Sequence, residues 1–92
     1  MYFVANWKMF GNLKSINTLD KVIKFSKSKE IKKGRLIYCP PYTLITSFFK
    51  KFENCLIDIG GQNCHESEDY GAHTGFVNPI MLKSIGANYV IL

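Results

Sequence analysis

The sequence of 92 residues is poor in several features that mark particular classes of protein. No apolar run approaches the roughly 18 to 20 residues that a membrane-spanning helix needs. The opening apolar residues are interrupted by Asn6 and Lys8, so we expect neither a membrane segment nor a secretion signal. The three cysteines are odd in number and lack the spacing of metal ligands, which predicts neither a disulfide framework nor a metal site. These absences favour a soluble, cytoplasmic protein without a cofactor.

Arginine is also scarce, because Arg35 is the single arginine and lysines supply most of the net charge of +5. Nucleic-acid readers usually favour arginine and interleave aromatic residues with the basic ones. Here the lysines fall on the outward faces of predicted helices, so a solvated lysine-rich surface is the favoured interpretation. Binding to nucleic acid or to another anionic surface rests on charge alone, and salt-dependent retention on DNA would support it.

Hydrophobic residues make up 47% of the chain and charged residues 21%, which is typical of a folded globular domain. The length allows one modest domain, in which only about 60 to 65% of the unfolded surface can be buried. A domain of this size tolerates an uncovered face or an unpaired strand edge poorly.

Short apolar segments alternate with helical patterns along the chain. We expect strands near residues 2–6, 36–39, 56–59 and 89–92, the third of them ended by Gly60 and Gly61. Apolar residues at helical spacing predict one helix over about 16–29 and a second after Thr43. Pro79 is well placed to begin a third helix that Gly86 ends.

This β-α-β-α-β-α-β order predicts an α/β fold with parallel strands joined by right-handed crossovers. The periodicity leaves open whether the strands form part of a barrel or an open, doubly wound sheet. Residues 62–76 form a polar segment that is too long for an ordinary turn, and loops of this length are usually functional.

A first candidate site follows the first predicted strand, in the segment Asn6-Trp7-Lys8-Met9. In parallel α/β folds, the carboxyl ends of strands face the side where ligands bind. A lysine there could act on an anionic substrate. The plainer alternative is a solvated lysine beside a packed tryptophan.

Five segments in this order and spacing resemble the amino-terminal part of triosephosphate isomerase. Each would be a weak signal by itself, but together they cover essentially the whole chain. They are Asn6-Trp7-Lys8-Met9, Pro40-Pro41-Tyr42-Thr43, Gly61-Gln62-Asn63, Gly71-Ala72-His73-Thr74-Gly75, and the run from Ile80 to Ala87.

The resemblance implies a (β/α)₈ barrel enzyme that interconverts dihydroxyacetone phosphate and glyceraldehyde 3-phosphate. Lys8 would then neutralise charge on the triose phosphate, and Asn6 would help to position it. The 62–76 segment resembles the family's dimer loop, in which Thr74 would support the partner's Asn6 and Lys8. Met9, with Phe10 beside it, occupies the position that receives this loop.

Isomerisation also needs a base and an electrophile that polarises the carbonyl group. In the family, the electrophile is a histidine in a Gly-His-Ser-Glu-Arg-Arg segment directly after the fourth strand, and the glutamate base comes later. His65 and His73 lie in the dimer-type loop and are no substitutes. We therefore expect residues 1–92 to form a single truncated domain, half of a barrel, that is inactive alone.

A half-barrel would leave the first and fourth strands unpaired, and such edges recruit other chains. We expect self-association into a dimer or tetramer, either by edge pairing or by repacking of the helices. Phe76 stands where the family usually carries an acidic residue, and it would cover exposed surface in such an assembly. The alternative function is a non-catalytic, oligomer-forming βα remnant.

Overall fold

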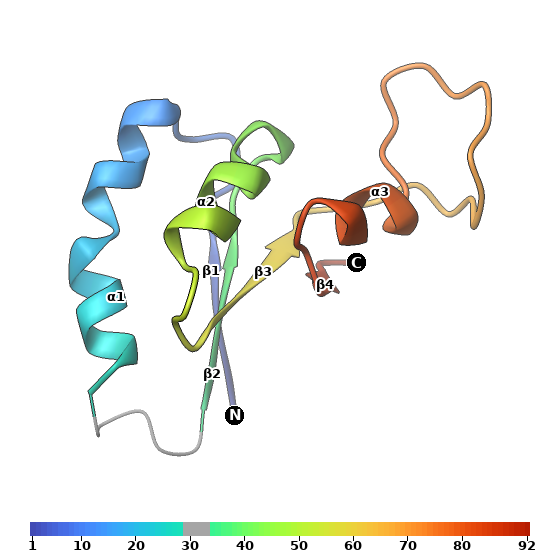
Figure 1. Cartoon of the computed structure of the whole chain (residues 1–92). Coiled ribbons are helices and arrows are strands. Elements are labelled where there is room, and N and C mark those ends of the chain that lie inside the picture. Colours follow the sequence, from blue (N-terminus) through green and yellow to red (C-terminus); the bar gives the residue numbers. More distant parts are fainter. Residues whose placement is uncertain (29–33) are drawn as a thin grey trace.

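The computed structural model describes residues 1–28 and 34–92, whose four strands alternate with helical segments (Figure 1). In chain order the elements are β1 (Tyr2–Asn6), the 3-10 helix η1 (Leu13–Thr18), α1 (Asp20–Ser26), β2 (Arg35–Cys39), the 3-10 helix η2 (Tyr42–Leu44), α2 (Ile45–Lys51), β3 (Ile57–Gly61), α3 (Pro79–Ser84) and β4 (Tyr89–Val90). The predicted alternation of strands and helices is confirmed.

The first helix is shorter than predicted and is preceded by a turn of different geometry. The Asn12 side chain accepts a hydrogen bond from the Lys14 N–H, and the Ser15 hydroxyl accepts one from the Asn12 N–H. This reciprocal capping starts η1, and α1 itself begins only at Asp20. The predicted end of this helix at residue 29 lies outside the described residues.

The last two strands also differ from their predicted ranges. β3 includes Gly60 and Gly61, because these residues pair with Tyr89 and Val90 of β4. β4 ends at Val90 and not at residue 92, since its partner strand ends at Gly61. One further hydrogen bond, from the Ile91 N–H to the Gly61 carbonyl at 3.0 Å, extends the contact between the two strands by one residue.

The sheet has the strand order β1-β2-β3-β4, and all three pairings are parallel. A doubly wound sheet reverses its strand order and carries helices on both faces. Here the order never reverses, and residues of α1, α2 and α3 join one hydrophobic core. The structure is therefore a curled half-barrel.

The curl brings the two outer strands towards each other on the concave face. The rings of Tyr2 in β1 and Tyr89 in β4 lie edge to face, with centroids 6.2 Å apart. Between them, Arg35 pairs with Asp58 at 2.9 Å. This hydrogen bond and the charge of Asp58 raise the pKa of Arg35.

The core lies between the convex face of the sheet and the helices. Phe48 is fully buried and meets the rings of Trp7 and Phe52 edge to face, at centroid distances of 4.9 and 5.9 Å. Leu82 of α3 packs close to Gly61 of β3. The core thus fixes the convex face, whereas the β1 edge is left open: Tyr2, Phe3 and Val4 are all at least half exposed.

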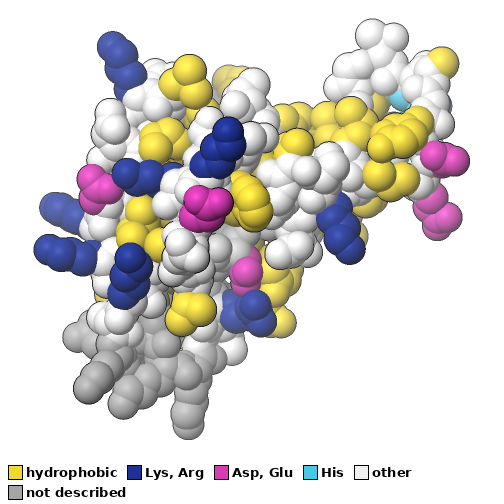
Figure 2. All heavy atoms as spheres, viewed as in Figure 1, with side chains coloured by type: hydrophobic (Ala, Val, Ile, Leu, Met, Phe, Trp, Pro, Cys, Tyr) yellow, Lys and Arg dark blue, Asp and Glu magenta, His cyan; other side chains and the backbone are white. Residues whose placement is uncertain are grey.

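The surface charges are distributed unevenly. In the face shown by Figure 2, lysine side chains are scattered over the α1 and α2 region, and acidic side chains gather at the loop that projects beyond α3. Within the described residues, no helix has the length and apolar character needed to cross a membrane.

Candidate active site

The segment after β1 is held in a sharply bent conformation. The Asn6 side-chain oxygen accepts a hydrogen bond from the Lys8 N–H at 2.9 Å, and the backbone of Lys8 has a φ of 55°. Asparagine side chains commonly form such bonds to the backbone two residues on. A non-glycine residue in the left-handed region is uncommon, and it is held there only when the surroundings over-determine it.

Gln62 helps to hold the Lys8 backbone in this conformation. Its side-chain amide donates hydrogen bonds to the Lys8 carbonyl at 2.8 Å and to the Cys39 carbonyl at 2.9 Å. The Trp7 N–H donates to the same Cys39 carbonyl at 3.0 Å. The carboxyl ends of β1, β2 and β3 are therefore tied together directly beneath Lys8.

The tryptophan and the lysine of this segment face different surroundings. The Trp7 ring is half-buried against Phe48, whereas Lys8 is exposed. Among residues 1–28 and 34–92, no carboxylate forms an ion pair with Lys8. A rigid backbone thus presents an ammonium group that is free to meet an anion, a geometry that also fits the plainer interpretation of a solvated lysine.

Neighbouring polar groups complete this end of the sheet. Tyr42, just after β2, donates hydrogen bonds from its hydroxyl to the backbone and side-chain oxygens of Asn63, just after β3. Burial, assisted by the charge of Cys64, raises the pKa of the Tyr42 hydroxyl. It therefore remains a protonated donor at neutral pH.

The remaining residues predicted for the site lie apart from this cluster. Met9 and Phe10 are strongly exposed, at 93% and 72%. Thr74 and Phe76 belong to the 62–76 loop, which projects away from the end of β1 (Figure 1). The structure thus brings Asn6 and Lys8 together, and it does not bring Thr74 to them within one chain.

Sequence reasoning had given no role to Gln62. The signal was present, because Gln62 follows a buried strand at the same end of the sheet as Lys8. The rule that singled out Lys8 applies to it equally.

Comparison with known proteins agrees with this architecture. The family model for triosephosphate isomerase matches residues 1–92. The chain belongs to the triosephosphate isomerase family. This membership confirms the resemblance that the five sequence segments indicated.

Individual relatives match over the same range. The triosephosphate isomerase of Wolbachia pipientis wMel is 43% identical over 90 residues, which are 97% of this chain and 35% of the relative. That of Aquifex aeolicus is 37% identical over 92 residues, again 35% of its length. The crystal structure of the Bartonella henselae triosephosphate isomerase superposes with a TM-score of 0.87 at 35% identity, covering 99% of this chain and 36% of that one. The chain thus spans about a third of the length of these relatives.

Proposed function

We propose that residues 1–92 supply the phosphate-facing lysine of a triosephosphate isomerase site, which becomes active only with a complementary carboxyl-terminal segment. The observation that carries the proposal is the position of Lys8: Asn6 and Gln62 hold its backbone at the carboxyl end of β1, and its ammonium group pairs with no carboxylate among the residues that the structure describes. A pre-positioned cation at a strand end can stabilise the charge that develops on an enediolate. The substrates would be dihydroxyacetone phosphate and glyceraldehyde 3-phosphate, with no cofactor.

The proton-transfer groups must come from elsewhere. Asp58 is engaged by Arg35 on the concave face, and His65 and His73 lie in the projecting loop. In the family, the histidine electrophile and the glutamate base both follow the part of the sequence that residues 1–92 match. Without them, a lysine alone cannot move a proton between adjacent carbons.

Complementation tests this proposal. The partner fragment is the part of the Wolbachia pipientis wMel relative that follows its matched 90 residues. We expect no turnover of glyceraldehyde 3-phosphate by either piece alone and measurable turnover by the mixture. Turnover by the 92 residues alone, or an inactive mixture in which the two pieces co-elute, would contradict the proposal.

Two lysine substitutions distinguish the effect of the charge at Lys8 from the effect of losing any surface lysine. Lys8→Met should lower kcat/KM of the mixture at least about 100-fold, the usual loss when one electrostatic stabiliser is removed. Lys21→Met, on the exposed surface of α1, should leave it unchanged. Equal activity of the two variants would mean that Lys8 has no role in catalysis.

The second candidate function is self-association through non-catalytic surfaces, with a second copy of the chain as partner. The open β1 edge, where Tyr2, Phe3 and Val4 are 62%, 51% and 51% exposed, supports it. Closed symmetry favours a dimer or a tetramer. Light scattering at micromolar concentration should give a mass of two or four chains, and a dispersed monomer would count against this function.

A further inference from the structure

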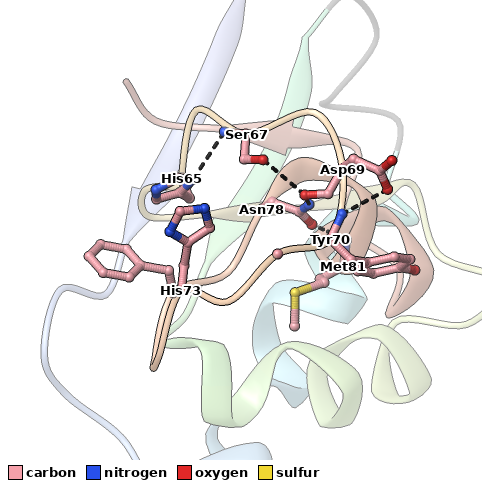
Figure 3. A pocket seen from close by; sticks show the side chains of 9 residues that line it. His65, Ser67, Asp69, Tyr70, His73, Asn78 and Met81 are labelled. Carbon is pink, nitrogen blue, oxygen red and sulfur yellow. Dashed lines mark hydrogen bonds between the residues drawn. The ribbon is translucent and has the colours of Figure 1, made fainter.

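Both histidines of the chain lie in the 62–76 loop and stack on each other (Figure 3). The ring centroids of His65 and His73 are 4.5 Å apart, and the planes are inclined by 29°. The ring of Phe76 meets His65 edge to face at 5.0 Å. Every imidazole group of the protein therefore belongs to one small cluster, which sits at the base of a projecting loop.

The hydrogen bonding of His65 fixes its protonation state. Its Nδ1 atom accepts a hydrogen bond from the Ser67 N–H at 3.0 Å, drawn as a dashed line in Figure 3. Its own backbone N–H donates to the Val77 carbonyl at 2.7 Å, which joins the two arms of the loop. A ring nitrogen accepts a hydrogen bond only when it carries no proton. The described loop therefore requires neutral His65 with the proton on Nε2.

The groups around the two rings offer little to stabilise an added charge. On one side lie Asp69 and Tyr70, and the Asp69 carboxylate accepts the Tyr70 N–H at 2.8 Å and points away from the imidazoles. Uncharged Asn78, which caps α3, and Met81 of α3 also lie on this side. On the other side of His65 are Tyr42, Cys64 and Glu66. Within the described part of the chain, none of these acids pairs with a histidine.

We infer that His65 and His73 form a pH-sensitive catch that holds the 62–76 loop in its present shape at neutral pH and releases it on acidification. Histidine is the side chain whose charge ordinarily changes close to neutral pH. A proton on Nδ1 of His65 abolishes the bond from Ser67, and a second proton on His73 places two like charges in one stack. Both changes favour an opened loop.

Hydrogen exchange of the full chain tests this directly. Exchange of the His65 and Ser67 amides, whose hydrogen bonds hold the loop, should be at least about 10-fold faster at pH 5.5 than at pH 8 after correction for the intrinsic effect of pH, because local opening exposes both amides. The amides of β2 and β3 should keep their protection and serve as the internal reference. Equal corrected exchange of the loop at the two pH values would overturn the inference.

A matched pair of variants identifies the responsible group. His65→Asn keeps an acceptor oxygen close to the position of Nδ1 but cannot be protonated there, so its loop should stay protected at pH 5.5. His73→Gln keeps the hydrogen bond between Ser67 and His65 and should retain part of the response. A His65→Asn loop that opens with acid as the wild type does would contradict the inference.

The ring nitrogens provide a measurement that needs no variant. Nitrogen-15 spectra at pH 8 should show Nδ1 of His65 unprotonated and Nε2 carrying the proton, with only two imidazole spin systems to assign because the chain has two histidines. A proton on Nδ1 of His65 at pH 8 would contradict the inference, and this result does not depend on whether any variant folds.

One consequence rests on the proposed self-association. If the loop contributes to that assembly, the mass measured by light scattering should fall between pH 8 and pH 5.5 in the wild type and not in His65→Asn. The exchange and tautomer measurements report on the loop within one chain. They therefore distinguish a failed catch from a failed assembly proposal.

Discussion

At the scale of single residues, Lys8 combines backbone strain with a surface position. Its φ of 55° costs a side-chain-bearing residue about 1 kcal/mol, a cost that glycine avoids. Lys8→Gly should therefore be about 1 kcal/mol more stable than Lys8→Ala, although both lack the ammonium group. Urea denaturation of the two variants measures the difference, and equal midpoints would mean that the left-handed conformation is not kept in solution.

Cys39 gives a second prediction at this scale. It is almost completely buried, and this burial raises the pKa of its thiol above the ordinary value. A raised pKa means that the unfolded chain releases its proton first as the pH rises. The stabilisation is therefore complete below the unfolded pKa, near pH 8.5, and is lost above it.

The unfolding free energy should accordingly fall between pH 8 and pH 10, and less steeply in Cys39→Ala than in the wild type. Burial also raises the pKa of Tyr38, so part of the slope should remain in the variant. Thr46→Ala, at an exposed position without a titrating group, should keep the wild-type slope. A Cys39→Ala slope equal to that of the wild type would refute this account of the thiol.

The sequence was informative about single residues where a general rule applies. The rule that ligands bind at the carboxyl ends of parallel strands selected Asn6 and Lys8, and both lie at the carboxyl end of β1. It could not give the left-handed backbone of Lys8, because that conformation depends on Gln62, which lies 54 positions away in the chain. Long-range hydrogen bonds of this kind leave no local pattern.

At the scale of elements, β3 has glycine at position 60 because the neighbouring side chains leave no room for a Cβ atom. A Cβ atom at Gly60 would lie 2.7 Å from the Cys39 sulfur and 3.3 Å from the Tyr89 Cβ. Gly60→Ala should therefore destabilise the chain by about 1 to 3 kcal/mol, the usual cost of overpacking. Thermal or urea unfolding provides the measurement.

A double-mutant cycle can assign the clash. Combining Gly60→Ala with Cys39→Ala removes the sulfur and should recover part of the loss, which gives a favourable coupling between the two sites. Additive losses would place the strain elsewhere, for example against Tyr89. The same crowding explains why the predicted third strand ended too early: glycine usually weakens the interior of a strand, but here close packing requires glycine inside the strand.

At the scale of the whole molecule, the periodicity of the sequence predicted alternating strands and helices but not the shape of the sheet. A barrel segment and a doubly wound sheet use the same local patterns. They differ in strand order and in which face the helices cover, and both are properties of the assembled chain. The strand order without reversal and the single hydrophobic core decide between them.

The open β1 edge leads to a prediction about self-association of the whole molecule. Val4 lies in the middle of that strand and is 51% exposed. A lysine on a strand edge discourages pairing with another chain. Val4→Lys should therefore shift the mass measured by light scattering towards the monomer, whereas Thr46→Lys on the exposed surface of α2 should not. An unchanged mass in Val4→Lys would exclude this edge from the assembly.

The contact between Tyr2 and Tyr89 has a practical consequence. The two rings mark opposite rims of the sheet, and only its bending brings them to 6.2 Å. Any flattening of the four strands must draw the phenols apart. Their mutual shielding in proton spectra is thus a built-in gauge of curvature, readable without adding a label.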